Sequence, residues 1–216
     1  VGASFGAGLA LIVGGFVVTW VTAHGAFDVP LLGRLAPWQV TFLMVGLPGV
    51  LLLPLLATVR EPLRRDLLAG VGAAGVPLRE ALAYFWTRRR AYLGLVLGLS
   101  MVSVFTYAIA AWVPTLFIRV HGWSARDVGV VYGLITLVLG MSGVVTGGWW
   151  ASRLRRAGYR DANWRVAFVD IALLVPCAIL APLPESPVVS MTLLALTVFL
   201  STLPYGVAAA ALQDIT

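Results

Sequence analysis

Six long apolar runs, separated by short polar stretches, dominate the pattern of this chain. A transmembrane helix needs roughly 20 apolar residues, because each residue adds about 1.5 Å and the apolar core of a bilayer is about 30 Å thick. The runs do not alternate polar and apolar residues as the strands of a membrane β-barrel do. The pattern therefore predicts an all-α, polytopic membrane helix bundle with six transmembrane helices, at residues 1–22, 38–59, 91–118, 128–150, 166–183 and 188–212.

The composition supports this prediction. Hydrophobic residues make up 60% of the chain and charged residues only 11%, whereas soluble domains contain about 25% charged residues. The net charge of +6 would suit nucleic acid, but the arginines lie in short stretches between apolar runs, so we expect no nucleic-acid partner. The single cysteine, Cys177, lies inside an apolar run, which excludes a disulfide or a paired-cysteine metal site within this chain.

The arginines are distributed unequally between the polar stretches. Seven lie between residues 60 and 90 and five between 151 and 165, whereas the other stretches hold three (Arg34, Arg119 and Arg126). Cytoplasmic loops of membrane proteins are enriched in Lys and Arg. We therefore expect residues 60–90 and a short basic loop at Gly147–Arg165 to face the cytoplasm, with both ends of the chain on that side of an inner or plasma membrane.

A short amphipathic helix is predicted in PLREALAYFWTRRR, residues 77–90. Proline suits the first turn of a helix, and Leu78, Leu82, Phe85 and Trp86 share one face. Such a face favours the headgroup region of a bilayer. A solvated basic loop and a site for anionic lipid are both compatible with the arginines, so membrane lipids are expected partners.

Two polar stretches are expected on the opposite side of the membrane. Residues 23–37 form a predicted loop of mixed charge, in which His24 has no Cys, His or acidic partner at metal-ligand spacing. In RVHGWSARD, Ser124 is predicted to cap the following helix, with Asp127 three residues later. Neither stretch indicates a metal site.

Small residues recur at helical spacing near the start of the chain. The run GASFGAGLALIVGG contains Gly6, Gly14 and Gly15, and small residues let two membrane helices approach closely. These glycines predict either a packing surface alone or a hinge between two halves of the protein that move.

Of the acidic residues in the sequence, Asp170 alone lies within a predicted membrane span. An ionisable residue at such a position is a candidate for function, here proton coupling. Its position five residues after Arg165 places it only about 7–8 Å from the cytoplasmic end. We therefore favour a structural ion pair with Arg153, Arg156 or Arg165.

The sequence gives little support for catalysis. Its Gly-x-Ser-x-Gly match, Gly2–Gly6, lies within the first apolar run, HExxH and Walker sequences are absent, and the two histidines lie in predicted loops. A membrane-embedded enzyme would need acids, His or Cys clustered at membrane depth, where only Asp170 qualifies. We therefore expect neither an enzyme nor a bound cofactor.

Several motifs resemble the major facilitator superfamily. The glycine-rich run Gly2–Gly15 is similar to the family's fifth helix, and Trp38–Gly49 followed by Arg60–Pro62 resembles its sixth helix and exit. GWWASRLRR at Gly148–Arg156 resembles the signature loop between helices eight and nine. PLREAL and WVPTLFIRVHG are most similar to the spinster-like branch. The chain also begins without Met, so we interpret it as an internal fragment covering helices five to ten of twelve.

This resemblance implies a division of the chain into parts. Residues 1–59 would be the last two helices of the N-terminal bundle, 60–90 a cytoplasmic connection, and 91–216 the first four helices of the C-terminal bundle. The signature residues Gly148, Ser152, Arg153 and Arg156, with Asp170, would form a cytoplasmic gate. Ser152 replaces the family's aspartate and Arg155 its glycine, so an electrostatic latch in this half is not expected.

The resemblance also implies a central cavity between two bundles that rock against each other. Polar residues at the right depth to line it are Thr106, Tyr107, Ser201, Thr202 and Tyr205, although each could instead form an interhelical hydrogen bond. The implied function is secondary active transport of a small organic or lipid-like amphipathic solute by alternating access, coupled to an ion such as the proton. A non-transporting receptor or scaffold on the same fold is the alternative.

Overall fold

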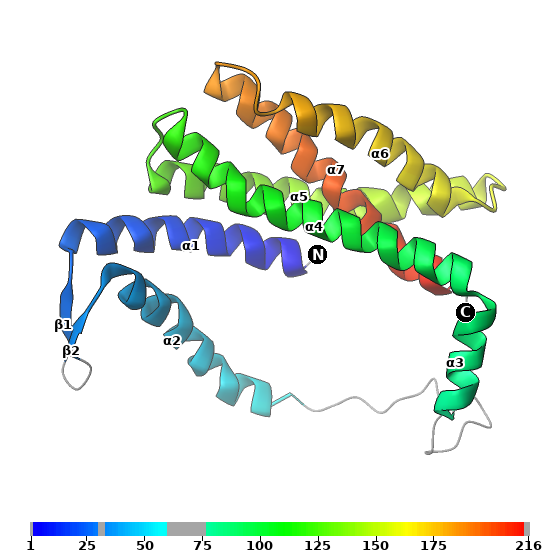
Figure 1. Cartoon of the computed structure of the whole chain (residues 1–216), viewed down its shortest axis with the longest axis horizontal. Helices are drawn as coiled ribbons and strands as arrows, with labels where there is room; N and C mark the ends of the chain where they lie inside the picture. The colour runs from blue at the N-terminus through cyan, green and yellow to red at the C-terminus, as the bar shows by residue number, and fades with distance from the viewer. Residues whose placement is uncertain (1, 30–32, 60–76, 214–216) are drawn as a thin grey trace.

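The computed structural model describes residues 2–29, 33–59 and 77–213, and these form a bundle of long helices (Figure 1). Six helices are long and apolar enough to cross a membrane. They are α1 (Gly2–His24), α2 (Pro37–Ala57), α4 (Arg89–Arg119), α5 (Ala125–Arg156), α6 (Ala162–Leu180) and α7 (Pro187–Gln213). The prediction of six transmembrane helices in an all-α bundle is therefore confirmed.

The amphipathic helix is also present, as α3 (Leu78–Thr87). It precedes α4 with only Arg88 between them. The predicted cap of α5 is confirmed as well, because the Ser124 hydroxyl accepts a hydrogen bond from the backbone N–H of Asp127 at 3.1 Å.

The basic stretch at Gly147–Arg165 differs from the prediction, because most of it is helical. Residues Gly147–Arg156 form the last turns of α5, residues 157–161 make the turn, and α6 begins at Ala162. Arginine, leucine and alanine favour helix, and cations in a last turn interact favourably with the helix dipole. Gly158, with φ 93°, then lets the chain reverse. The polarity of the stretch shows where the helix leaves the membrane, not where it ends.

The predicted loop at 23–37 contains a short β-hairpin. Strand β1 (Phe27–Val29) pairs antiparallel with β2 (Gly33–Leu35). Leu35 packs with Val21 of α1 and Val40 of α2, so the hairpin ties together the ends of these two helices. His24 ends α1 and is exposed, with its ring Nδ1 2.7 Å from the Trp20 carbonyl oxygen.

Helix α5 lies at the centre of the packing, through a stripe of glycines on one face. The first part of the stripe contacts α1: a Cβ on Gly8 would lie 2.7 Å from the Gly133 carbonyl oxygen, and one on Gly15 would lie 3.1 Å from Gly129 Cα. The second part contacts α7, where Gly147 adjoins Leu203 and Gly206 adjoins Val144. Without side chains at these positions, the backbones of the three helices approach closely.

Only one of the three glycines predicted to form a hinge takes part in this packing. Gly15 contacts α5, whereas Gly6 and Gly14 have open space where a Cβ would be. The reason is helical periodicity: Gly8 and Gly15 are seven residues apart and share the face toward α5, and the other two glycines point elsewhere.

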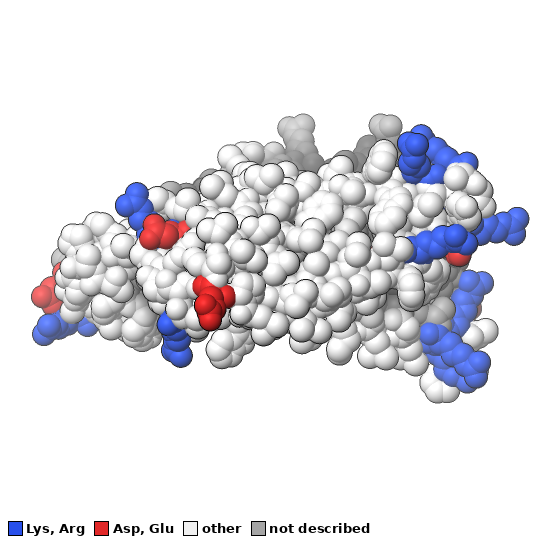
Figure 2. All heavy atoms as spheres, turned by 90° about the horizontal axis from the view of Figure 1, so that it is seen from above, with Lys and Arg blue, Asp and Glu red and all other residues white. Residues whose placement is uncertain are grey.

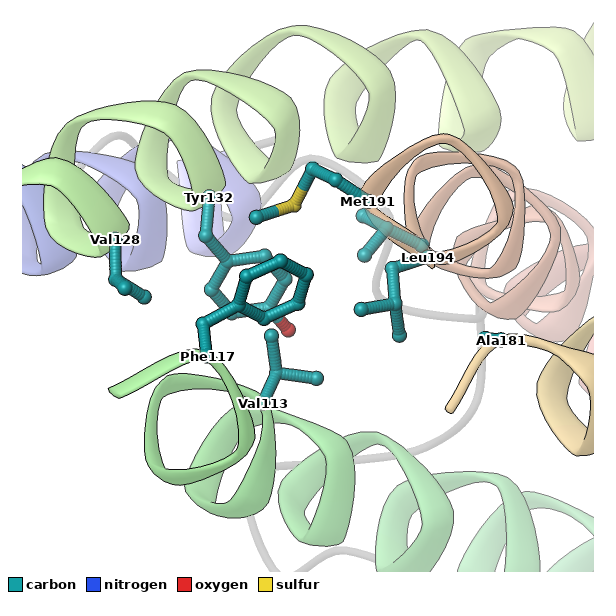
Figure 3. Close-up of a cluster of buried hydrophobic side chains, with 8 residues drawn as sticks. Val113, Phe117, Val128, Tyr132, Ala181, Met191 and Leu194 are labelled. Atoms are coloured by element: carbon teal, nitrogen blue, oxygen red, sulfur yellow. The ribbon is translucent and has the colours of Figure 1, made fainter. Parts of the chain in front are cut away.

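A hydrophobic cluster, which we call the end cluster, closes one end of the bundle (Figure 3). Phe117 and Met191 point into the space between α4, α5 and α7, and Phe117 is completely buried. The buried members of the end cluster are Val113, Phe117, Val128, Tyr132, Ala181, Met191, Leu194 and Val198. They come from the end of α4, the start of α5, the turn after α6 and the first half of α7. The helices are therefore tightly packed at this end.

The charges of the described residues are divided between the two ends of the bundle (Figure 2). The end opposite the end cluster carries the arginines around α3, the start of α4 and the turn between α5 and α6. The end-cluster side carries fewer arginines, and Asp28, Asp127 and Glu185 lie there with them. Residues 60–76, which include Arg60, Arg64 and Arg65, lie outside the described part of the chain.

Candidate functional site

A cavity of about 710 Å³ lies between α1, α4, α5 and α7. Helix α4 lines it from Ser103 to Ala110, and α7 lines it from Val198 to Tyr205. Tyr132 belongs both to the lining and to the end cluster. The cavity therefore lies directly beneath the tightly packed end of the bundle.

All five residues predicted to line a cavity do line this one: Thr106, Tyr107, Ser201, Thr202 and Tyr205. The two helices that carry them pack against each other. A hydrogen bond of 3.3 Å between Ser103 Oγ and the Tyr205 hydroxyl joins α4 to α7 beside the cavity. Two residues that are 102 positions apart in the sequence are thus brought together on one wall.

Most hydroxyl groups of the lining donate their hydrogen to the backbone of their own helix. Thr106 donates to the Val102 carbonyl at 2.8 Å, Ser201 to that of Val198 at 3.0 Å, and Thr136 to that of Tyr132 at 2.9 Å. Each oxygen keeps lone pairs that can accept a hydrogen bond. The cavity therefore presents mainly hydrogen-bond acceptors to a ligand.

Three tyrosines give the cavity its aromatic character. Tyr107 is 79% exposed, and its hydroxyl makes no hydrogen bond within the described part of the chain. Tyr132 is buried, and Tyr205 is partly exposed. None of the lining residues that the structure describes carries a charge. The arrangement suits an apolar or aromatic ligand with a few polar groups.

Replacing Tyr205 with Phe is expected to lower stability slightly. The change removes the hydrogen bond between α4 and α7, and such bonds in membrane proteins contribute about 0.6 kcal/mol on average. Thermal unfolding in detergent should show a small decrease in Tm for Tyr205→Phe and none for Tyr107→Phe. An equal decrease in both variants would contradict the role of this hydrogen bond.

The wall formed by α1 was not predicted. It consists of Ala3, Ser4, Ala7, Ala10 and Leu11. Their spacing of three or four residues marks one helical face. Small apolar residues at that spacing are compatible with packing as well as with a cavity wall, so the sequence alone does not identify them.

Asp170 is 1% exposed, and neither of its carboxylate oxygens has a hydrogen-bond partner among the residues that the structure describes. The predicted ion pair with Arg153, Arg156 or Arg165 is therefore wrong. Val166 and Leu174, one turn away on either side along α6, are also buried, and Val166 packs with Ala151 of α5 and Val207 of α7. The carboxyl group thus faces the interior of the bundle, whereas the arginines lie at the end of the bundle.

The arginines near α6 have other contacts. The Arg165 Nε donates to both carboxylate oxygens of Asp161 at 2.9 Å, which holds the pKa of that exposed carboxyl below its usual value. The Arg153 guanidinium lies 5.6 Å from the centre of the Trp149 ring. Arg155 donates to the Asn163 side chain at 3.0 Å.

The signature residues lie on the last turns of α5. Ser152 is exposed and donates to the Gly148 carbonyl of its own helix at 2.8 Å. Its hydroxyl is therefore engaged within α5, and among the described helices it caps no neighbour. The structure brings these residues near the turn between α5 and α6, but not to the cavity.

No group of three or more His, Cys, Asp or Glu side chains that could hold a metal ion occurs among the described residues.

Comparison with known proteins adds the family. Residues 1–216 match the Major Facilitator Superfamily. The chain is 29% identical, over 185 residues, to a protein of Mycolicibacterium smegmatis (strain ATCC 700084 / mc(2)155) named an MFS-type efflux pump. This match covers 85% of the chain and 42% of the relative, so the chain spans less than half the length of that protein. No solved structure matches the chain. The match along its whole length shows that the chain belongs to the Major Facilitator Superfamily, and its six long apolar helices fit that family.

Proposed function

We propose that the protein is a secondary active transporter that moves a small amphipathic organic solute by alternating access. The observation that carries this proposal is the uncharged cavity shared by α1, α4, α5 and α7. Membership of the Major Facilitator Superfamily supports it, because such transporters bind substrate between two bundles that rock about a fixed site.

The arrangement of the helices fits two bundles that meet at the cavity. In this proposal α1 and α2 belong to one bundle, and α4 to α7 belong to the other. The glycine contacts between α1 and α5 would then be the seam between the bundles. The arginine-rich end would face the cytoplasm, with residues 60–90 connecting the bundles there and both ends of the chain on that side.

The lining of the cavity favours a neutral or cationic substrate over an anionic one. Its described residues offer no cation to bind a carboxylate or phosphate, whereas hydroxyl oxygens and tyrosine faces attract donors and organic cations. The resemblance to the spinster-like branch suggests a lipophilic or organic-anion cargo, and the uncharged lining favours the lipophilic one. The name of the mycobacterial relative, an efflux pump, suggests export as the direction.

Counterflow in proteoliposomes tests this substrate class. Full-length protein would be reconstituted with unlabelled tetraphenylphosphonium inside, and uptake of labelled tetraphenylphosphonium would be compared with uptake of labelled tetraphenylborate, its anionic counterpart, in matched vesicles. We expect protein-dependent exchange of the cation but not of the anion. Exchange of the anion alone would contradict the proposed substrate class, and exchange of neither would contradict the use of this cavity for lipophilic ions.

We further propose that transport is coupled to protons and that Asp170 is the proton-binding residue. A charge buried without a partner is costly in a protein interior, so the gain and loss of a proton at Asp170 would change how α6 packs on α5 and α7. Ionisable residues inside a membrane commonly mark such proton relays.

Replacing Asp170 with Asn is expected to uncouple transport. Asparagine keeps the size of the side chain but cannot exchange a proton, so accumulation driven by an imposed pH gradient should be lost while counterflow exchange continues. The Asp161→Asn variant, changed at the exposed turn, serves as the control and should keep both activities. Retention of gradient-driven accumulation by Asp170→Asn would show that protons are coupled elsewhere or not at all.

A further inference from the structure

Helix α3 carries an apolar face that the described part of the chain leaves largely uncovered. Leu78 is 74% exposed and Trp86 71% exposed, and Leu82 and Phe85 are also exposed. The spacing of these four residues places them together on one side of the helix. Exposed apolar surfaces of this kind mark sites of interaction with a membrane or another molecule.

The position of α3 relates this face to the membrane. Figure 1 shows α3 at the arginine-rich end, running across the direction of the long helices. The rings of Phe85 and Tyr92 are 4.7 Å apart, which fixes α3 against the first turn of α4. A helix that runs across the direction of the transmembrane helices at their end would lie along the membrane surface.

The charges on and after α3 are almost all positive. Arg79 lies within it and Arg88, Arg89 and Arg90 follow, whereas Glu80 is the acid that α3 contains. The Arg89 guanidinium lies 5.1 Å from the centre of the Trp86 ring, and that of Arg88 lies 5.1 Å from the centre of the Tyr84 ring. These contacts place cations beside the aromatic side chains that prefer the level of the lipid headgroups.

We propose that α3 is a binding surface for anionic phospholipids of the leaflet at the arginine-rich end. The apolar face would lie at the boundary of the acyl chains, and the arginines would bind the phosphate groups. Amphipathic helices with aromatic and basic residues bind membranes in this way. The charge favours an anionic lipid surface over a neutral one. This proposal does not depend on the substrate of the cavity or on transport.

Spin-label accessibility tests the proposal in the full-length protein. Single cysteines would be placed at Leu82 on the apolar face and, as the matched control, at Ala83 beside it, with Cys177 replaced by Ala. The labelled proteins would be studied in nanodiscs of phosphatidylcholine alone and of phosphatidylcholine with phosphatidylglycerol. Membrane-soluble oxygen and a water-soluble nickel chelate would serve as relaxation agents.

We expect the ratio of oxygen to nickel accessibility to be several-fold higher at Leu82→Cys than at Ala83→Cys when phosphatidylglycerol is present. This difference should decrease in phosphatidylcholine alone and in a variant with Arg88, Arg89 and Arg90 replaced by Gln. Equal ratios at the two positions would overturn the proposal. Protection of Leu82→Cys from both agents would show that protein covers the face, and a difference independent of lipid charge and of the arginines would exclude specific anionic binding.

Discussion

Replacing Ala110 with Trp is expected to reduce transport by at least about tenfold, which corresponds to about 1.4 kcal/mol. Ala110 lines the cavity on α4 and is exposed to it. An indole at this position would occupy space that a solute needs, and because Ala110 is exposed, the larger side chain should leave the fold intact. The initial rate of tetraphenylphosphonium counterflow in proteoliposomes would measure the effect.

The matched control is Ala108→Trp. Ala108 is exposed on the same helix and does not line the cavity, so this variant adds the same bulk on another face of α4. It should transport at the native rate. If both variants lost transport equally, the effect would come from α4 itself. If Ala110→Trp transported normally, the cavity would not be the pathway.

Replacing Gly147 with Ala, which adds a single methyl group, is expected to destabilise the bundle by about 1–3 kcal/mol. A Cβ at this position would overlap the backbone carbonyl of Leu203. A backbone carbonyl within a helix cannot move aside as a side chain can, so α5 and α7 would have to separate. Their contact forms a large part of the packing of the described residues.

The neighbouring Gly148→Ala variant is the matched control and is expected not to destabilise the bundle. A Cβ there would lie 3.4 Å from the Gly206 carbonyl oxygen, which is an ordinary contact. Alanine favours helix over glycine by about 1 kcal/mol, so this variant should be as stable as the native protein or more stable. Thermal unfolding in detergent would measure both variants. A Tm for Gly147→Ala equal to that for Gly148→Ala would show that the close approach of α5 and α7 is not required.

The transmembrane helices could be predicted from the sequence because apolar runs of this length have few alternatives to a membrane span. The ends of these helices were less predictable. Arginine-rich Gly147–Arg156 continues α5 because polarity controls where a helix meets water, whereas helix propensity controls whether it continues. The hairpin between α1 and α2 was missed because each of its strands has only three residues.

The cavity was predictable in part. Hydroxyl and aromatic residues at membrane depth on α4 and α7 are unusual enough to indicate a polar interior site. The alanines of α1 carry no such signal, because small apolar residues are equally suited to packing. The glycines of α5 are visible in the sequence as a stripe, but which helix packs against each of them depends on tertiary structure.

Asp170 shows a different limit. Its distance from Arg165 along the sequence suggested an ion pair, but a partner on the same helix must also lie on the same face. Arg165 pairs with Asp161, one turn before it and toward the end of the bundle, whereas Asp170 faces α5 and α7. Sequence spacing therefore predicted a partner that the structure does not show.

Labelling of a cysteine in the cavity from each side of the membrane would test alternating access most directly, without knowledge of the substrate. Thr106→Cys, in a background with Cys177 replaced by Ala, would be exposed to a membrane-impermeant maleimide in sealed right-side-out and inside-out vesicles, with Ala108→Cys as the control. Access from both sides at Thr106→Cys, reduced by tetraphenylphosphonium, is the predicted result. Labelling from one side only, or equal labelling at the two positions, would contradict a cavity that opens in turn to each side.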